Sequence, residues 1–362
     1  MTNIDPATPR RLLISAFGIH MGGGLVLLRA LLGTLQQHDA IVLLDERLRG
    51  KASITFESGR VEVRYVARSM VARWRSLQRL AAEARDTDVL LCFNSLPPAI
   101  RSRARVVTFV QAPHFVGGLE GMRYAWLTRI RLALEAKWLR HGARHSDEIW
   151  AQTPTMFELV QTNFPASTAR MAPLIDPALH DLLTDPARGE VSSAPSAPRF
   201  DAASFFYPAD LLGHKNHPLL VAAWRMLASE DLHPRLALTL RDGEWAELQA
   251  SAGRALPPNI VNLGRMPREQ VLAELARSSA LLFPSYAETF GLPMVEATAL
   301  GVPIVASERG FVRDVCVPVQ TFDPESPRSI ADAVRRFMNL PRAGLTAATF
   351  WSATTFVEQL LS

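Results

Sequence analysis

The chain has 362 residues, of which 48% are apolar and 20% charged, and its net charge is +4. This length is too great for one ordinary core and suits two domains of about 150 to 180 residues each. The composition is typical of a soluble globular protein, and the absence of any run of about 18 apolar residues argues against a membrane span. The polar start, MTNIDPATPRR, predicts a cytoplasmic protein without a signal peptide. Cys92 and Cys316 lie far apart in apolar contexts, so we expect buried thiols rather than a disulfide or a metal site.

Positive charge is concentrated in the first half of the chain. Residues 1–170 carry a net charge of +9, and the remainder carries −5. A helix expected over 122–141 has two interpretations: it contacts anionic lipid head groups, or it is the solvated face of an ordinary surface helix. We expect no nucleic-acid partner, because no recognised motif accompanies the charge. The basic side chains of this stretch are Arg123, Arg129, Arg131, Lys137, Arg140 and Arg144.

Apolar runs and helical periods alternate through the first half of the chain. This alternation predicts an open parallel sheet with helices between the strands. The expected strands are 12–17, 40–44, 89–93, 106–110 and 148–151, and the expected helices are 25–35, 77–84 and 122–141.

The second half repeats the same alternation after a stretch that is rich in Pro, Ser and Ala, which predicts an interdomain linker over 176–199. Two Rossmann-like lobes are therefore expected, with the loops at the carboxyl ends of their strands lining a shared cleft. Helical spacing also appears near the C-terminus, over 345–361. The expected strands are 204–207, 236–240, 260–263, 281–283, 301–307 and 318–322, and the expected helices are 217–228, 268–276, the segment after Gly291, and 329–338.

Two loops of the first half carry candidate functional residues. The first strand is followed by Gly-Ile-His-Met-Gly-Gly-Gly, where Gly23 and Gly24 let the backbone approach a ligand at a helix start. The spacing does not match the dinucleotide fingerprint, and an ordinary tight turn is the alternative. His114 follows the strand 106–110 beside a proline, and it is either a site residue in the crevice or a polar loop residue.

Lys215 opens the second half of the chain in an unusual place. It is one of three lysines and stands at the start of a helix, where the helix dipole disfavours a cation unless an anion is bound. Lys215 is therefore a candidate ligand for a diphosphate.

The segment FPSYAETFGLPMVEATALGVPIVAS, residues 283–307, is the most informative of the chain. It places Glu288 in the loop after a buried strand and Glu296 in the first turns of the next helix. A carboxylate can accept two hydrogen bonds from a vicinal diol, and unpaired amides near residues 290–292 suit a phosphate. Glutamates near a helix start also occur for structural reasons alone.

The Glu-x7-Glu spacing with its surrounding Pro-Ser, Gly-Leu-Pro and Gly-Val-Pro-Ile-Val-Ala-Ser resembles glycosyltransferase family 4, the retaining nucleotide-sugar transferases of GT-B fold. The resemblance implies two Rossmann-like, doubly wound α/β domains that face each other across a cleft. It places an acceptor-side domain over 1–175, a linker over 176–199 and a nucleotide-sugar domain over 200–342. The last helix, within 343–362, is expected to pack back on the first domain.

The resemblance also implies roles for single residues. Glu296 holds the ribose diol, Glu288 orients the donor sugar, and His114 lies against that sugar. Gly264 and Arg265 border the nucleobase. The catalytic residues expected are His114, Glu288 and Lys215. The donor-binding residues expected are Gly23, Gly24, Lys215, Gly264, Arg265, Glu288, Thr289, Phe290, Gly291, Leu292 and Glu296.

One departure from the family pattern stands out. Many family members carry an arginine a few residues before the lysine, and this chain has no arginine between Tyr207 and Lys215. Phosphate binding is then expected to depend on Lys215, backbone amides and His214.

The function implied is retaining transfer of a hexosyl unit from a nucleotide diphosphate sugar to a hydroxyl of a glycan or lipid-linked acceptor, in bacterial surface polysaccharide synthesis. GDP-mannose, UDP-hexose and a deoxysugar nucleotide all fit, with a slight preference for mannosyl. No metal or cofactor is expected, because no paired Asp-x-Asp loop is visible. Peripheral contact with the inner membrane face is a further hypothesis. The alternatives are a non-catalytic nucleotide-sugar-binding partner and another GT-B enzyme, such as a nucleotide-sugar epimerase.

Overall fold

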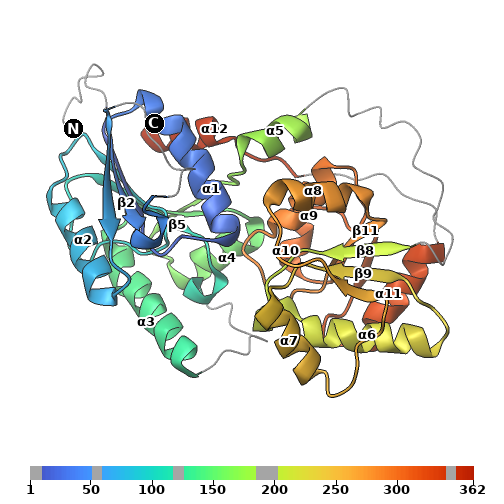
Figure 1. The fold of residues 1–362 in the computed structure, drawn as a ribbon. Helices are drawn as coiled ribbons and strands as arrows, with labels where there is room; N and C mark the ends of the chain where they lie inside the picture. Colours follow the sequence, from blue (N-terminus) through green and yellow to red (C-terminus); the bar gives the residue numbers. More distant parts are fainter. Residues whose placement is uncertain (1–9, 51–58, 117–125, 185–202, 340–347) are drawn as a thin grey trace. The chain divides into compact units, whose positions relative to one another are not determined.

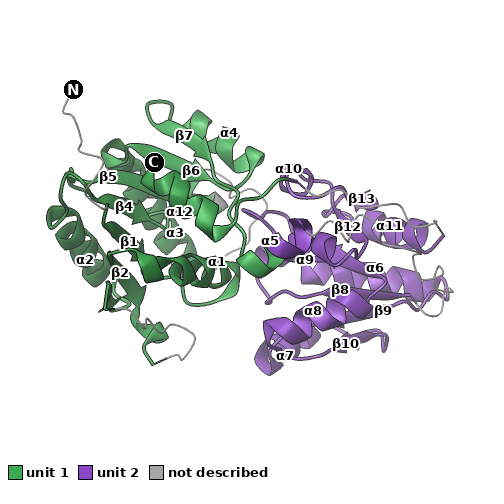
Figure 2. Cartoon of the chain, turned by 90° about the horizontal axis from the view of Figure 1, so that it is seen from above, with its two compact units in different colours: residues 1–119, 125–180, 349–362 green, residues 120–124, 181–348 purple. Residues whose placement is uncertain are grey.

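The protein is described by a computed structural model that covers residues 10–50, 59–116, 126–184, 203–339 and 348–362 (Figure 1). The chain divides into two compact units, which Figure 2 colours separately. Unit 1 takes residues 1–119, 125–180 and 349–362, and unit 2 takes residues 120–124 and 181–348. No helix in the described ranges is both long enough and apolar enough to cross a membrane.

Unit 1 is built on a parallel sheet of seven strands. In the central register, Ile14 lies between Val42 and Leu91. Chain order reverses between β1 and β4, and ligands of such sheets bind outside the carboxyl ends of the strands at this switch point. The strand order is β3 (Val61–Val66), β2 (Ala40–Asp45), β1 (Leu12–Ala16), β4 (Val89–Cys92), β5 (Arg105–Val110), β6 (Glu148–Ala151) and β7 (Thr168–Met171).

Helices cover both faces of this sheet, because alternate residues of each strand point to opposite sides. Ile14 belongs to a core cluster with α1 (Gly22–Gly33) and α12 (Ala353–Leu361). Its neighbour Leu13 belongs to the other cluster. That second cluster includes residues of α2 (Met70–Ala82), α3 (Trp126–Gly142) and α4 (Pro154–Asn163).

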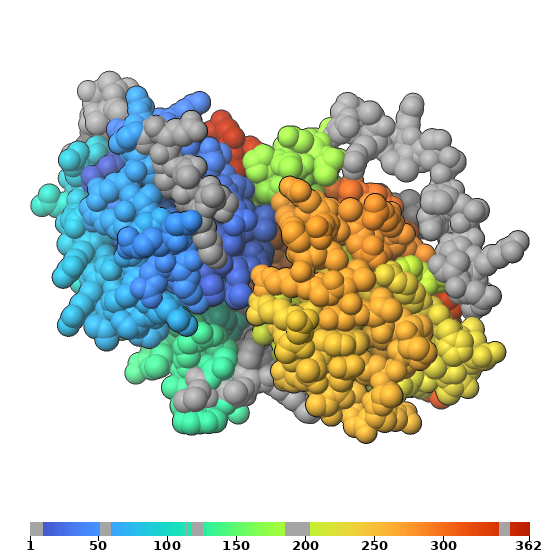
Figure 3. Space-filling view, viewed as in Figure 1, coloured from blue at the N-terminus to red at the C-terminus, as the bar shows by residue number. Residues whose placement is uncertain are grey.

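The end of the chain completes unit 1. The Trp351 amide donates to the Pro173 carbonyl at 2.8 Å, and the Ile175 amide donates to the Trp351 carbonyl at 3.0 Å. The Phe356 ring lies 5.2 Å from the Phe109 ring and 5.1 Å from the Trp150 ring, between centroids. In Figure 3 the red surface of α12 adjoins the blue surface of α1. The last fourteen residues therefore close a core that the first 180 residues build.

Unit 2 has a six-stranded parallel sheet of the same design. Chain order reverses between β8 and β11, which gives unit 2 its own switch point. The strand order is β10 (Ile260–Asn262), β9 (Arg235–Leu238), β8 (Ser204–Tyr207), β11 (Ala280–Phe283), β12 (Ile304–Ser307) and β13 (Gln320–Phe322).

The helices of unit 2 connect successive strands. Trp224 of α6 and Phe337 of α11 both pack on Phe205 of β8, with ring centroids 5.7 and 5.4 Å away. The helices are α6 (His217–Ser229), α7 (Asp242–Ser251), α8 (Arg268–Arg277), α9 (Leu292–Ala299), α10 (Gly310–Arg313) and α11 (Pro327–Asn339).

The structure departs from the sequence-based expectation at the start of the linker. Residues 177–184, expected to be linker, form a helix, α5 (Pro177–Thr184), whose Leu179, Leu182 and Leu183 have a helical spacing that the prediction missed. The Asp176 side chain accepts from the Leu179 amide at 3.3 Å, and Pro177 takes the first helical position, so local capping starts the helix. The rest of the predicted linker, the start of the predicted helix 122–141 and residues 343–347 lie outside the described residues. Cys92 and Cys316 are buried and unpaired, as predicted.

Candidate functional site

Lys215 and Glu288 meet at the switch point of unit 2. Lys215 follows β8 and Glu288 follows β11, the two strands that flank the reversal of chain order. The Lys215 Nζ donates to Glu288 Oε1 at 2.5 Å, and their side chains are only 16% and 13% exposed. The Lys215 Nζ also lies 5.7 Å from the centroid of the Phe283 ring. The sequence placed these two residues in separate loops, and the topology brings them together.

Hydrogen bonds hold the two loops in register. The Tyr286 amide donates to the His214 carbonyl at 2.8 Å. The Tyr207 hydroxyl donates to the Lys215 carbonyl at 3.0 Å and lies 3.1 Å from Ser285 Oγ. Asn216 has a left-handed backbone conformation and donates from Nδ2 to the Pro284 carbonyl at 3.1 Å. These bonds fix the backbone under Lys215 and Glu288.

Two histidines lie beside this pair in sequence, His214, which is half-buried, and His217, which is buried. Burial lowers the pKa of His214 to about 4, and the neighbouring Lys215 charge lowers it further while Glu288 acts in the opposite direction. Burial, with the charges of Lys215 and His214, lowers the pKa of His217 to about 3. Both rings are therefore neutral at pH 7, and neither adds positive charge for a phosphate.

Glu296 lies in α9 and has a different cationic partner. It is 6% exposed, and Arg268 Nε donates to its Oε1 at 2.9 Å. Arg268 is the first residue of α8 and was not singled out by the sequence. A cation at the first position of a helix is disfavoured by the helix dipole. The criterion that selected Lys215 could therefore have found Arg268 as well.

The turn between the two glutamates is shaped by Gly291. Its φ of +72° is left-handed, and it caps the N-terminus of α9. A Cβ at this position would lie 2.4 Å from Met294 Cε. Phe290 and Leu292 are buried on either side, and Thr289 is partly exposed. Glycine thus lets the chain turn tightly into α9, where Pro293 has no amide hydrogen and the Met294 amide donates to the Gly291 carbonyl at 2.9 Å.

Arginine is present near Asp210, in the loop that leads to Lys215, but it comes from other strands. Asp210, in the loop after β8, lies 3.7 Å from Arg241 Nη2 and 3.9 Å from Arg265 Nη1. Arg241 follows β9 and Arg265 follows β10, so three neighbouring strands bring these groups to one sheet edge. Gly264, with a φ of +71°, precedes Arg265. The segment between Tyr207 and Lys215, which has no arginine of its own, thus carries a carboxylate that lies near two guanidinium groups.

Unit 1 has a pocket of about 330 Å³ at its own switch point. Gly24 and His114 both line it, so the structure brings together these two predicted residues, whereas Gly23 is exposed and is not in the lining. His114 Nε2 lies 3.6 Å from Glu135 Oε2 of α3. Sequence reasoning missed most of the polar lining. The missed residues include His20, Arg47, Arg73, Asn94, Gln111, Arg131 and Glu135.

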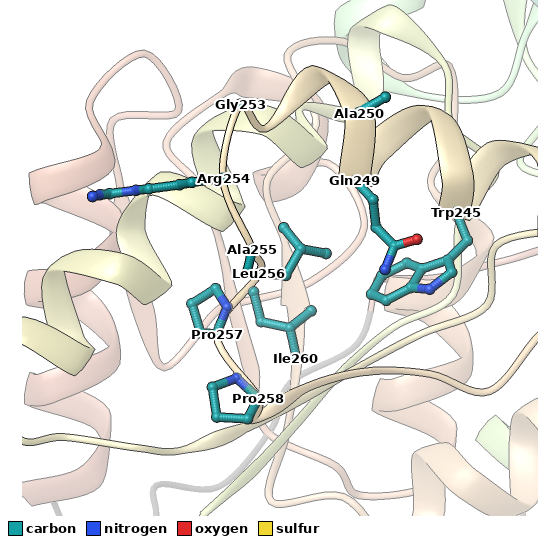
Figure 4. A pocket seen from close by; sticks show the side chains of 10 residues that line it. All are labelled: Trp245, Gln249, Ala250, Gly253, Arg254, Ala255, Leu256, Pro257, Pro258 and Ile260. Atoms are coloured by element: carbon teal, nitrogen blue, oxygen red, sulfur yellow. The ribbon is translucent and has the colours of Figure 1, made fainter.

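A second cavity, of about 590 Å³, lies in unit 2 against α7 (Figure 4). Trp245 and Gln249 of α7 form one side, and Pro257, Pro258 and Ile260 lie opposite. Its lining contains no carboxylate, histidine or lysine, and Ile260 is the first residue of β10. This cavity therefore offers little chemistry and is not at the carboxyl end of β10.

Known proteins match both the sequence and the architecture. The family model described as Glycosyl transferases group 1 matches residues 193–348. An E. coli trehalose-6-phosphate structure bound with UDP-2-fluoro glucose is similar over 97% of this chain and 94% of that chain, with a TM-score of 0.64 and 13% identity. WaaG, a glycosyltransferase involved in lipopolysaccharide biosynthesis, is similar over 91% and 90%, with a TM-score of 0.63 and 14% identity. The fold is GT-B. At these identities the structural likeness shows the fold alone.

The sequence match to a curated relative is shorter. A glycogen synthase of Mycobacterium tuberculosis is 31% identical over 154 residues, which is 40% of this chain and 36% of that protein. The match thus spans about a third of the relative's length. The group 1 match lies within the second half of the chain, and the nucleotide-sugar domain expected there stays a prediction.

Proposed function

We propose that the protein is a retaining glycosyltransferase that moves a hexosyl unit from a nucleotide diphosphate sugar to a hydroxyl of a glycan or lipid-linked acceptor. The observation that carries the proposal is the Lys215–Glu288 pair at the switch point of unit 2, next to the helix start that leads to Glu296. A cation, a helix start and two carboxylates suit the phosphates and hydroxyls of a sugar nucleotide.

The donor would exchange partners with the pair. The donor diphosphate binds the Lys215 ammonium, so that Lys215 no longer pairs with Glu288. The hydroxyls of the donor sugar then donate hydrogen bonds to the Glu288 carboxylate. Glu296 keeps its bond from Arg268 on Oε1. We place the ribose diol on the Glu296 carboxylate, because a carboxylate can accept hydrogen bonds from both hydroxyls of a diol. Arg268 thus orients Glu296.

Arg241 and Arg265 would supply the guanidinium that the sequence lacks before Lys215. Both lie within 4 Å of Asp210 and remain 42% and 50% exposed, so an incoming diphosphate can recruit either one. Guanidinium groups bind phosphate oxygens in a bidentate manner. Asp210 then acts as the group that holds them at this sheet edge before the donor arrives.

Transfer requires no protein nucleophile in this proposal. The acceptor hydroxyl attacks the anomeric carbon from the face that the nucleotide leaves, and the departing phosphate takes the hydroxyl proton. The protein contributes by positioning the donor and by stabilising the negative charge of the leaving diphosphate with Lys215 and the first amides of α9. No metal ion is needed where these groups carry that charge.

The setting proposed is bacterial surface polysaccharide synthesis at the cytoplasmic side of the inner membrane. UDP is the first nucleotide to test, because two structural neighbours are bound to UDP ligands, the E. coli structure and an Anabaena protein, HepE, in complex with UDP and glucose. HepE is 16% identical, with a TM-score of 0.58 over 90% of this chain and 89% of that chain. GDP-mannose remains the alternative donor.

A second candidate function is that of a non-catalytic nucleotide-sugar-binding partner. It is favoured by Asp210, a carboxylate in the segment where many family members place an arginine. Such a protein would bind the donor without turning it over. Release of free nucleotide from a donor sugar, with transfer to any glycan acceptor, separates the enzyme from the binding partner.

The first experiment is a thermal-shift screen against UDP, GDP, dTDP and ADP and their sugars. A ligand at 100 times its dissociation constant adds about 2.7 kcal/mol to the unfolding free energy. We expect one nucleotide family to raise the melting temperature of the wild type and of Glu269→Gln, a matched change at an exposed residue beside Arg268. Glu296→Gln should lose most of that shift. A shift that survives in Glu296→Gln, or no shift with any nucleotide, contradicts the proposed donor site.

A further inference from the structure

The pocket in unit 1 carries positive charge that the proposed function does not use. Its lining includes three guanidinium groups, those of Arg47, Arg73 and Arg131, and one carboxylate, Glu135. A second carboxylate, Asp45, lies directly beneath at the end of β2 and is completely buried. The arrangement of charges around Asp45 decides what the pocket attracts.

Asp45 is saturated by its own partners. Arg47 donates from Nε to Oδ1 at 2.6 Å and from Nη2 to Oδ2 at 2.8 Å. The Gly18 amide donates to Oδ2 at 3.0 Å, and Arg73 Nη2 donates to the same oxygen at 3.2 Å. Burial by itself raises the pKa of Asp45, but the hydrogen bonds from Arg47 and Gly18 outweigh it and hold the pKa well below its usual range. Asp45 is therefore a permanent anion shared by two permanent cations.

His20 lies beside the Arg47 guanidinium. Its Nε2 lies 2.8 Å from Arg47 Nη1, and its Nδ1 lies 3.1 Å from the Gly18 carbonyl. Because arginine can only donate and a carbonyl can only accept, Nε2 accepts from Arg47 and Nδ1 donates to the Gly18 carbonyl. Among the described residues, Arg47 and Arg73 thus share the single buried carboxylate of Asp45, and exposed Glu46 also acts on the charge of Arg47.

The two guanidinium groups that share Asp45 are poorly solvated. The side chains of Arg73 and Arg47 are only 12% and 28% exposed. Arg73 Nε is buried and has no hydrogen-bond partner among the described residues, and the same holds for Asn94 Oδ1. Asn94 uses its Nδ2 to donate to the Phe17 carbonyl at 3.1 Å, which leaves Oδ1 as a free acceptor. A buried cation is costly unless an anion compensates it, and a free acceptor suits a hydroxyl.

We propose that this pocket binds an anionic sugar acceptor, with its phosphate or carboxylate on Arg73 and Arg131 and a hydroxyl on Asn94. This inference rests on the proposed function, because it assigns the acceptor of the same reaction. A volume of about 330 Å³ suits a monosaccharide unit with one charged group. The diphosphate of the donor is the other source of such an anion, but Lys215 and the start of α9 in unit 2 already provide for it.

The test is calorimetric titration of the full chain with glucose 6-phosphate, glucuronate, inorganic phosphate and neutral glucose, and separately with UDP. At least one of the two anionic sugars should bind at least tenfold more tightly than glucose. Arg73→Gln should weaken that binding at least tenfold, whereas Arg75→Gln, an exposed residue of the same helix that is not in the lining, should leave it unchanged. UDP affinity should be the same in all three proteins.

A second pair of variants keeps the test independent of folding, because Arg73 packs on Gly18 and Asp45. Arg131 is exposed on α3, and Arg131→Gln should also weaken binding while Arg129→Gln does not. Equal binding of glucose and the anionic sugars, or wild-type binding in Arg131→Gln, overturns the inference. A loss of UDP affinity in Arg73→Gln assigns the anion to the donor and also overturns it. Failure of UDP to bind the wild type counts against the proposed function instead, since it leaves the sugar titration of unit 1 unaffected.

Discussion

Single residues set the geometry of the candidate donor site, and Gly291 does so through its backbone. The residue joins the Glu288 loop to α9 in a left-handed conformation that costs an L-residue about 1–2 kcal/mol. Its missing Cβ also leaves room for the Met294 side chain. Any side chain here both strains the turn and displaces a residue of the helix. The first amides of α9 depend on this turn for their direction.

Replacing Gly291 with alanine should therefore weaken nucleotide binding. We expect Gly291→Ala to cost about 1–2 kcal/mol of stability and to raise the dissociation constant of UDP about tenfold, because the helix-start amides move. Gly301→Ala is the matched control: Gly301 has nearly the same φ, +70°, and nothing lies within 4 Å of its Cβ position. Calorimetry and chemical denaturation measure both effects. Equal loss of UDP affinity in the two variants would show that strain alone, rather than the position of α9, is responsible.

The sequence could predict some site residues and not others. Lys215 was found because a cation is unusual at a helix start, and Arg268 met the same criterion. Glu288 and Glu296 were found through the Glu-x7-Glu segment and its resemblance to a known family. Asp45, Arg47 and Arg73 have no such local mark. They come from β2, the turn after it and α2, and only the strand order of unit 1 brings them to one pocket. Convergence of this kind depends on topology, which local patterns do not encode.

At the scale of elements, burial decides which strands a sequence reveals. The predicted strands that correspond to β1, β2, β4 and β5 are nearly continuous apolar runs, because both faces of a parallel sheet are covered. The edge strands β3 and β7 were not predicted. Their sequences, VEVRYV and TARM, contain charged residues, and most of their side chains are partly or fully exposed. Helices α4 and α7 were missed as well. Each is short and has no long apolar period, and local hydrogen bonds at the N-terminus mark where it begins.

Helix α3 combines exposed apolar side chains with basic ones. Trp126, Ile130 and Leu134 are 68%, 49% and 51% exposed, and their spacing of four residues places them along one stripe of the helix. Arg129 and Arg140 are also exposed. An apolar stripe beside basic residues suits the interface of an anionic membrane. This feature supports the lipid interpretation of the helix over that of an ordinary solvated face.

We expect the protein to bind vesicles that contain about one-third phosphatidylglycerol and not vesicles of neutral lipid. Each basic residue near an anionic surface contributes about 1 kcal/mol, so Arg129→Glu with Arg140→Glu should lower the partition coefficient at least about thirtyfold. Trp126→Ser with Ile130→Ser should also reduce binding. The control is Arg277→Glu with Arg328→Glu, two exposed residues of unit 2. Co-sedimentation measures the partition, and unchanged partitioning of both α3 variants refutes the membrane contact. Arg123, the other basic residue of interest, lies outside the described residues.

At the scale of the whole molecule, the chain returns to its first unit after building the second. Unit 2 occupies most of the sequence between residue 180 and residue 349, and α12 then fills one face of the unit 1 sheet. Unit 1 therefore lacks part of its core until the last residues are in place. The sheet of unit 2 differs, because its strands β8 to β13 all come from one continuous part of the chain.

Because each unit has its own core, we expect a core mutation in one unit to lower the unfolding transition of that unit alone. Phe356→Ala removes a buried ring that packs on Phe109 and Trp150, and should cost unit 1 about 3–5 kcal/mol. Phe337→Ala, which removes the ring that packs on Phe205, should destabilise unit 2 by a similar amount. On the proposed function, UDP raises only the unit 2 transition, so calorimetric scans with and without UDP identify each one. Phe356→Ala should lower the temperature of the transition that UDP leaves unchanged. Phe337→Ala should lower the temperature of the transition that UDP raises. If both variants lower a single common transition, the two units unfold as one cooperative body, and the α12 segment would then couple them rather than complete unit 1 alone.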